Sequence, residues 1–160
     1  NIDVALRIGT LPSSGLIARR LGTTWLRVCG SPSYLKRHGT PRTCDALARH
    51  ERLGYAVNGR VTPWRLCDGD RVVELAPSSR IAVNTADALI ELAVAGAGLA
   101  WMCEFMTSPP HGKLVEVVPR TACVSSPIHA VTLPTRQKLP KVRAFVELVA
   151  AELAAHGVQR

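Results

Sequence analysis

Strand-like and helix-like segments alternate along most of this 160-residue chain, and this order constrains the fold more than any other feature. The side chains from Ile2 to Ile8 alternate strictly between apolar and other types, which predicts a strand with one apolar face. Helix signals follow Ser31-Pro32, Asn84 and Leu139-Pro140, with strand-like runs between them. Because strands that alternate with helices are typical of α/β proteins, we expect an α/β fold with a mainly parallel sheet.

The remaining strands are expected in short apolar runs that turn residues separate. A hairpin is predicted from Trp64–Cys67 to Arg71–Leu75, because Asp68-Gly69-Asp70 suits a turn that needs positive φ. The other strands are expected over Leu16–Leu21, Leu26–Cys29, Gly54–Val57, Arg80–Val83, Leu99–Met102, Leu114–Val118 and Ile128–Leu133.

Capping residues set the expected helix boundaries. Asn84 is predicted as the N-cap of the central helix, with Asp87 in a capping-box-like position and Gly96 and Gly98 ending the helix. The other helices are expected from N-cap Ser31 to Gly39, from about Cys44, briefly before Met106, and from Leu139-Pro140 to the end of the chain.

The charge pattern limits the classes of partner. The chain carries 20 basic and 12 acidic residues, a formal net charge of +8, which fits an anionic ligand, nucleic acid or a generally basic surface. The arginines form no dense run and aromatic residues are few, whereas a single-strand nucleic-acid footprint clusters both. The sequence therefore does not favour direct DNA contact by this segment.

Motifs for catalysis, metals and cofactors are absent from the sequence. It contains no G-x-S-x-G elbow, no phosphate loop and no histidine spacing that suits zinc, so we predict no enzyme, metal or cofactor. Five widely spaced cysteines without a C-x-x-C pair indicate small buried side chains in a reducing compartment. The acidic residues Asp45 and Glu51 are expected to be solvated.

Both ends of the chain suggest a piece of a longer protein. The chain begins with Asn1, and no basic-then-apolar signal segment precedes the first strand. The first strand lacks an obvious partner and the last helix needs another layer. We expect apolar surface at both ends of the chain that another element or another chain must cover. The residues concerned are Ile2, Val4, Leu6, Ile8, Val142, Phe145 and Val149.

Four blocks of sequence resemble the effector-binding domain of LysR-type transcriptional regulators, in family order. They are Asp3–Gly9 with Leu16–Gly22, then Cys29–Leu35 with His38–Pro41, then Asn84–Ala100, and finally Pro134–Arg136 with Leu139–Phe145. The second block is close to the family's ASPAYL and the third to its AGLGIA turn. The sequence departs from the family at Trp101-Met102-Cys103, where leucine-proline is common. The resemblance therefore does not define the shape of the ligand cleft at these residues.

The resemblance implies a two-lobed fold of the periplasmic-binding-protein type II class, with one lobe complete and the other partial. Residues 1–22 would form the end of the first lobe, residues 23–130 the second lobe, and residues 131–160 the return to the first lobe. The implied function is to sense a small molecule between the lobes and switch a DNA-bound oligomer. A solute-binding protein or an enzyme on the same fold is the alternative.

The implied partners follow from the same resemblance. They are a small-molecule effector and further copies of the chain in a dimer or tetramer. An anion or carboxylate as the effector is a separate inference, from Arg7 and the helix N-terminus at Asn84. DNA would be contacted only through an N-terminal domain outside this sequence, the location would be the cytoplasm, and no membrane or cofactor is expected.

The candidate ligand-binding residues are Arg7, Gly9, Leu11, Tyr55, Asn84, Thr85, Gly98 and Trp101. A helix beginning at Asn84-Thr85 presents free N–H groups to an anion, although plain capping explains the same residues. Arg7 either clamps a carboxylate in bidentate fashion or pairs structurally with Asp3 or another acid. Tyr55 and Trp101 either form an apolar wall of the cleft or pack in the core.

Overall fold

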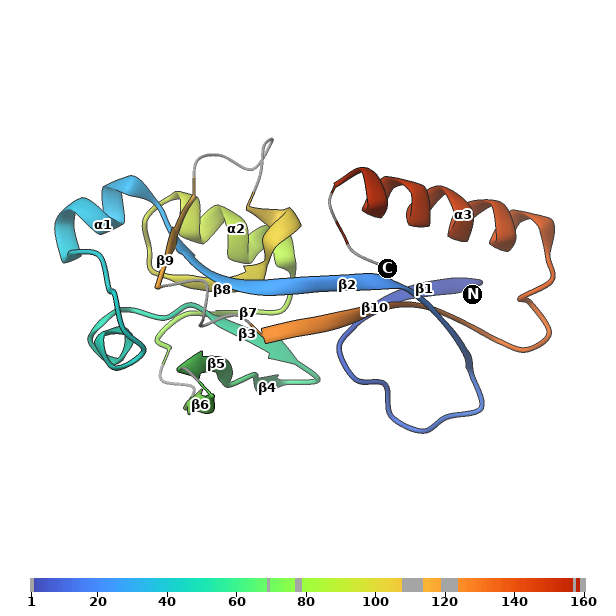
Figure 1. Cartoon of the computed structure of the whole chain (residues 1–160), viewed down its shortest axis with the longest axis horizontal. Helices are drawn as coiled ribbons and strands as arrows, with labels where there is room; N and C mark the ends of the chain where they lie inside the picture. Colours follow the sequence, from blue (N-terminus) through green and yellow to red (C-terminus); the bar gives the residue numbers. More distant parts are fainter. Residues whose placement is uncertain are drawn as a thin grey trace. The chain divides into compact units, whose positions relative to one another are not determined.

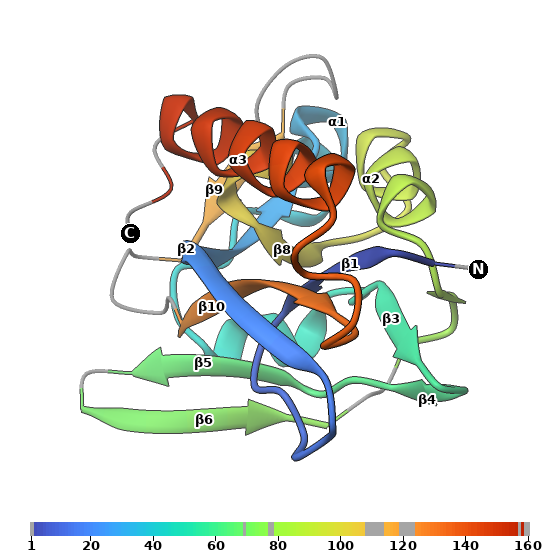
Figure 2. The same ribbon diagram turned by 90° about the vertical axis from the view of Figure 1, so that its right-hand side faces the viewer.

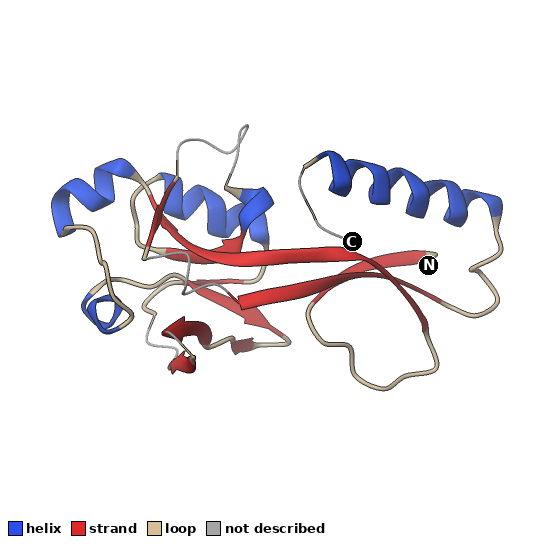
Figure 3. Ribbon diagram, viewed as in Figure 1, coloured by secondary structure: helices blue, strands red, loops and turns tan. Residues whose placement is uncertain are grey.

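The computed structural model describes residues 2–68, 70–76, 79–107, 114–118, 124–156 and 158. The chain divides into two compact units, which are Asn1–Thr24 with Ser125–Arg160 (unit 1) and Trp25–Val124 (unit 2). Figure 3 shows that each unit contains both strands and at least one helix. The predicted turn residue Gly69, together with His111 and Cys123, lies outside the described residues.

Unit 1 consists of strands with one long helix along them (Figure 1). Its elements are β1 (Val4–Ile8), the first part of β2 (Ile17–Gly30), β10 (Val124–Thr132) and α3 (Pro140–Ala155). β1 pairs antiparallel with β10, from Val4 opposite Thr132 to Ile8 opposite Ile128. β10 is in turn a neighbour of β2. Pro140 occupies the first turn of α3, where the missing N–H has no helical partner to lose.

Apolar side chains of unit 1 divide between a buried and an exposed set. Val142, Val146 and Ala150 of α3 are buried. Leu6 and Ile8 of β1 are 46% and 43% exposed, and Phe145 is 41% exposed. The expectation of uncovered apolar area is confirmed for these three residues and for Ile2, which is 76% exposed. It is wrong for Val142, because Val142 lies on the face of α3 that packs inward.

Unit 2 contains three groups of paired strands. β8 (Ala100–Cys103) and β9 (Val115–Val117) pair antiparallel with the later part of β2. β3 (Gly54–Val57) lies between β4 (Arg60–Val61) and β7 (Ala82–Val83). β5 (Trp64–Asp68) and β6 (Arg71–Leu75) form the predicted hairpin, which Figure 2 shows as two adjacent ribbons.

The helices of unit 2 are short and begin at recognisable caps. They are α1 (Pro32–His38), the 3₁₀ segments η1 (Asp45–Arg49) and η2 (Glu104–Met106), and α2 (Ala86–Val94). Ser31 Oγ accepts the Tyr34 N–H at 3.3 Å, as the N-cap signal predicts, and Gly39 follows α1 with φ of 81°. None of the described helices is long and apolar enough to span a membrane.

The prediction of a mainly parallel sheet is wrong. Among the described strand pairs with a defined register, only β3 and β7 run parallel; a single parallel bridge also joins Arg52 to Leu99. The predicted strands Leu16–Leu21 and Leu26–Cys29 are one continuous strand, β2, whose neighbours β8 and β9 run antiparallel to it. Alternation of strands and helices in sequence does not fix strand direction, because hairpins and long connections occur within the same order.

The predicted N-cap of the central helix is one residue too early. Thr85, with extended backbone, is the N-cap of α2, and its Oγ1 accepts the Ala88 N–H at 3.4 Å. Asn84 and Thr85 are both good capping residues, so the sequence does not decide between them. Gly96 has φ of +76° just after α2, as a helix-ending glycine requires, whereas Gly98 has a different role.

Two clusters of buried side chains form the core of unit 2. One cluster contains Val28, Tyr34, Leu35, Cys44, Leu47, Trp64, Leu66, Leu99 and Val117. The other contains Leu53, Leu89, Ile90, Ala93, Ala100 and Met102. Ala100 and Met102 alternate with Trp101 along β8, so the two clusters lie on opposite faces of that strand.

Candidate functional site

The predicted ligand-binding residues fall into two sets, one in each unit. Arg7, Gly9 and Leu11 belong to unit 1, and the other five belong to unit 2.

Arg7 lies on β1, directly opposite His129 on β10, and its side chain is exposed. The structure shows no ion pair between Arg7 and Asp3 among the described residues. The Asp3 carboxylate contacts Arg136 and, at 2.5 Å, Lys141, and these cations lower the pKa of Asp3. No hydrogen bond or ion pair of the Arg7 side chain occurs within the described part of the chain.

Gly9 and Leu11 shape the chain as it leaves β1. Gly9 has φ of +107°, a conformation that side chains with a Cβ rarely adopt, and its N–H donates to the Pro127 carbonyl at 2.9 Å. Leu11 is half-buried in the following loop. The glycine therefore fixes the direction of the loop next to Arg7.

Tyr55, Asn84 and Thr85 lie close together in unit 2. β3 and β7 run parallel with Tyr55 opposite Val83, so both strands end at the same edge, where α2 begins. In open α/β sheets ligands bind at the carboxyl ends of the strands, and a helix N-terminus there favours an anion. Tyr55 is half-buried against the core cluster that includes Leu89 and Ile90.

Gly98 and Trp101 occupy structural positions. A Cβ on Gly98 would lie 2.8 Å from the Glu51 carbonyl oxygen, so close packing requires glycine here. Trp101, opposite Val28 on β8, packs against the cluster on the other face of the strand from Tyr55. Tyr55 and Trp101 therefore do not form one wall.

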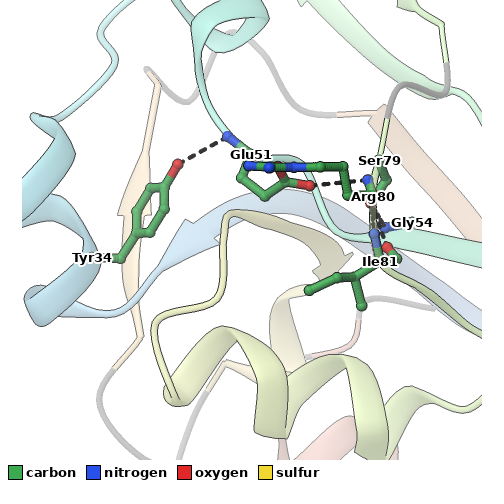
Figure 4. A network of polar contacts seen from close by, with 6 residues as sticks. All are labelled: Tyr34, Glu51, Gly54, Ser79, Arg80 and Ile81. Carbon is green, nitrogen blue, oxygen red and sulfur yellow. Dashed lines mark hydrogen bonds and ion pairs between the residues drawn. The ribbon is translucent and has the colours of Figure 1, made fainter.

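A polar network that the sequence analysis missed joins distant segments of unit 2 (Figure 4). The Glu51 carboxylate accepts the Arg80 backbone N–H and Nε–H, each at 3.1 Å. The Glu51 N–H donates to Tyr34 Oη at 3.0 Å. The expectation that Glu51 is solvated is wrong, since its side chain is only 19% exposed. No spacing rule reveals a pair 29 residues apart.

Two side chains in or next to this network, Tyr34 and His50, have shifted pKa values. Tyr34 Oη lies 3.2 Å from His50 Nδ1. Burial raises the pKa of Tyr34, and burial together with the nearby His38 lowers the pKa of His50. Ser79 Oγ accepts the Gly54 N–H at 3.0 Å, which holds the segment before β7 against β3. The network therefore links α1, the segment after η1 and the segment before β7, next to the two parallel strands.

A second ion-pair group joins β2, η2 and β9. Arg27 Nη2 lies 3.1 Å from Glu104 Oε2, and Arg27 Nη1 lies 3.4 Å from Glu116 Oε1. Among the described residues, no group of three or more histidine, cysteine or acidic side chains is placed to hold a metal ion.

The cysteines of unit 2 differ in environment. Cys29, Cys44 and Cys103 are buried and Cys67 is half-buried. Cys44 Sγ donates to the Cys67 carbonyl at 3.9 Å. Burial, the nearby Asp68 and Asp45, and Cys67 raise the pKa of Cys44, which favours the unreactive thiol.

A cavity of about 260 Å³ lies in unit 1 against α3. Its lining combines apolar side chains with two guanidinium groups, and comprises Val4, Ile17, Arg19, Ala130, Thr132, Gln137, Val142, Arg143 and Val146. None of the eight predicted residues lines it.

The sequence matches the profile of the LysR substrate binding domain over residues 1–154. The chain belongs to this family. The chain is 31% identical over 156 residues to the HTH-type transcriptional regulator CrgA of Neisseria meningitidis serogroup C, covering 95% of this chain and 52% of the relative. It is 34% identical over 157 residues to an HTH-type transcriptional regulator of Xanthomonas campestris, covering 94% and 46%. This LysR-family chain therefore spans about half the length of the curated relatives it matches.

The solved structure of the CrgA regulatory domain from Neisseria meningitidis superposes on this LysR-family chain with a TM-score of 0.81. The two are 30% identical, and the match covers 95% of this chain and 76% of that one. The expected fold class, α/β of the periplasmic-binding-protein type, is confirmed. The relatives named above are transcriptional regulators.

Proposed function

We propose that this chain is the part of a DNA-binding transcriptional regulator that senses a small-molecule effector. The observation that carries the proposal is the match to the LysR substrate binding domain over residues 1–154, supported by the likeness to the CrgA regulatory domain. DNA contact belongs to an N-terminal domain outside this sequence, and the cytoplasm is the proposed location. The scattered arginines support this division of roles.

The proposed effector is an anion, with a small carboxylate as the preferred class. Each unit offers one position for it. In unit 1, the exposed Arg7 guanidinium has no acidic partner within the described residues and suits a bidentate contact with a carboxylate. In unit 2, the N-terminus of α2 at Asn84-Thr85, beside Tyr55, presents N–H groups and a partial positive charge. Gly9 and Leu11 would contribute backbone and apolar contacts beside Arg7.

The regulator is proposed to act as a dimer or tetramer. Exposed apolar side chains on β1 and α3 support self-association through unit 1, since such surface is normally covered. The residues concerned are Leu6, Ile8, Phe145 and Leu148.

Binding of the full-length protein to labelled DNA from its own upstream region tests the proposal. Fluorescence anisotropy would be measured with and without the small-molecule fraction of an extract of the source cells. A change in DNA affinity supports a sensing role. The proposal fails if the protein binds no DNA, or binds it identically with and without that fraction.

A further inference from the structure

We propose that unit 1 has a binding site of its own, against α3, for a phosphate monoester with a short aliphatic chain. Arg19 and Arg143 bind the phosphate, and the apolar side chains of the same cavity contact the chain. Neither Arg7 nor the N-terminus of α2 lines this cavity. The inference therefore goes beyond the proposed effector positions and does not depend on them.

The first support is a cavity with access from solvent. It measures about 260 Å³ and lies where α3 runs along the strands of unit 1 (Figure 1). Arg19 on β2 and Arg143 on α3 line it and are both exposed, so the cavity is open to solvent. A second cavity of about 250 Å³ shares Arg19 with it and also lies against α3, through Ala150. A ligand can therefore reach this side of the helix.

The second support is the charge at the cavity. The side chains of Arg19 and Arg143 form no hydrogen bond or ion pair with another described residue. None of the described residues that line the cavity is acidic. Glu147, one turn after Arg143 on α3, is exposed and is not part of the lining. Two guanidinium groups at one cavity match the charge of about −2 that a phosphate monoester carries near neutral pH.

The number of donors favours a phosphate over a carboxylate. One guanidinium can satisfy both oxygens of a carboxylate in bidentate fashion. A phosphate monoester presents three strongly accepting oxygens, so two guanidinium groups can each donate to it. Gln137 lies half-buried in the same lining, and its side-chain amide has no hydrogen-bond partner among the described residues. This amide N–H is a third donor for the phosphate.

The uncharged part of the ligand follows from the rest of the lining. Val4, Ile17, Ala130, Val142 and Val146 are aliphatic, and the last three are buried. Val142 and Val146 are one helical turn apart, so they lie on the same face of α3. Because one water occupies about 30 Å³ in the liquid, 260 Å³ corresponds to about nine non-hydrogen atoms. Butyl phosphate has this size, and its chain gains from burial against aliphatic side chains.

The test uses the full-length protein with butyl phosphate as the probe. Isothermal titration calorimetry measures its dissociation constant, together with those of inorganic phosphate, which lacks the chain, and butanol, which lacks the charge. We expect saturable binding of butyl phosphate, and at least about tenfold weaker binding of the other two, because each lacks one kind of contact. In competition against butyl phosphate, pentanoate carries the same chain on a carboxylate and should be at least about fivefold weaker.

Variants test the residues of the cavity. Arg19→Met and Arg143→Met should each weaken butyl phosphate about tenfold, because each removes a charge-assisted contact. Arg65→Met makes the same replacement at an exposed arginine of β5 that lines neither cavity, and should change binding less than about twofold. Ala130→Leu places a larger side chain in the cavity. It should weaken binding at least about tenfold and leave the thermal midpoint of the unliganded protein unchanged or higher, as cavity filling does.

Three results would overturn the inference. They are no saturable binding of butyl phosphate, equal binding of inorganic phosphate or butanol, and wild-type affinity in both Arg19→Met and Arg143→Met. If another part of the full-length protein fills the cavity, butyl phosphate does not bind and Ala130→Leu lowers the thermal midpoint through overpacking, which also refutes the inference. If Ala130→Leu does not fold, the arginine variants and the comparison of the three compounds still decide.

Discussion

Replacement of Gly98 by alanine should destabilise the protein because there is no room for the added methyl group. The new Cβ would lie 2.8 Å from the Glu51 carbonyl oxygen, and 3.2 Å from both Glu51 Cγ and Leu53 Cγ. The closest atom is backbone in a segment that the parallel bridge from Arg52 to Leu99 holds in place, so it cannot rotate away. Overpacking of this kind costs about 1–3 kcal/mol.

We expect Gly98→Ala to lower the free energy of unfolding by about 2 kcal/mol and the thermal midpoint by about 6 °C. Urea denaturation followed by circular dichroism gives the first value, and calorimetry gives the second. Gly15→Ala is the matched control, because nothing lies within 4 Å of its added Cβ and its φ is not positive. That control should be neutral or slightly stabilising. Equal stability of the two variants would refute the packing role of Gly98.

Three further predictions concern caps, charge and association. Thr85→Ala should cost about 1 kcal/mol in urea denaturation and Asn84→Ala less than about 0.5, and the reverse order would contradict the N-cap assignment. Lys141 and Arg136 hold the pKa of Asp3 below 3.8, so this carboxylate stabilises the fold above that pH and loses its effect as the pH falls through the folded-state pKa. Asp3→Asn should therefore lower the thermal midpoint at pH 7, and a difference from wild type that persists below pH of about 2 would contradict the ion pairs. Phe145→Glu with Leu148→Glu should reduce self-association in sedimentation velocity, and an unchanged oligomer would rule out this face of α3.

Local signals in the sequence predicted most of the elements. Ser31-Pro32 and Gly39 define α1, and Leu139-Pro140 begins α3, because capping and proline geometry depend on a few adjacent residues. The hairpin strands on either side of Asp68-Gly69-Asp70 were predicted with correct bounds to within one residue. Strand direction could not be predicted, because it depends on pairings between residues far apart in the chain.

Less of the candidate site than of the fold could be predicted from the sequence. Arg7 was identified from its place beside Gly9, but its neighbour His129 lies 122 positions later and is revealed only by the register of β1 and β10. Glu51 was expected in solvent, because nothing near it in sequence indicates Arg80. Gly98 was interpreted as a helix stop, since a close approach to Glu51 leaves no local pattern.

Thermal stability of the full-length protein across a panel of small carboxylates and their neutral amides tests the central claim most directly. A ligand at a hundredfold excess over its dissociation constant stabilises the folded state by about 2.7 kcal/mol, which corresponds to roughly 8 °C. The account predicts that at least one carboxylate raises the midpoint, that its amide does not, and that Arg7→Met abolishes the shift. Stabilisation by neutral compounds alone, or by a carboxylate with equal effect on Arg7→Met, would contradict it.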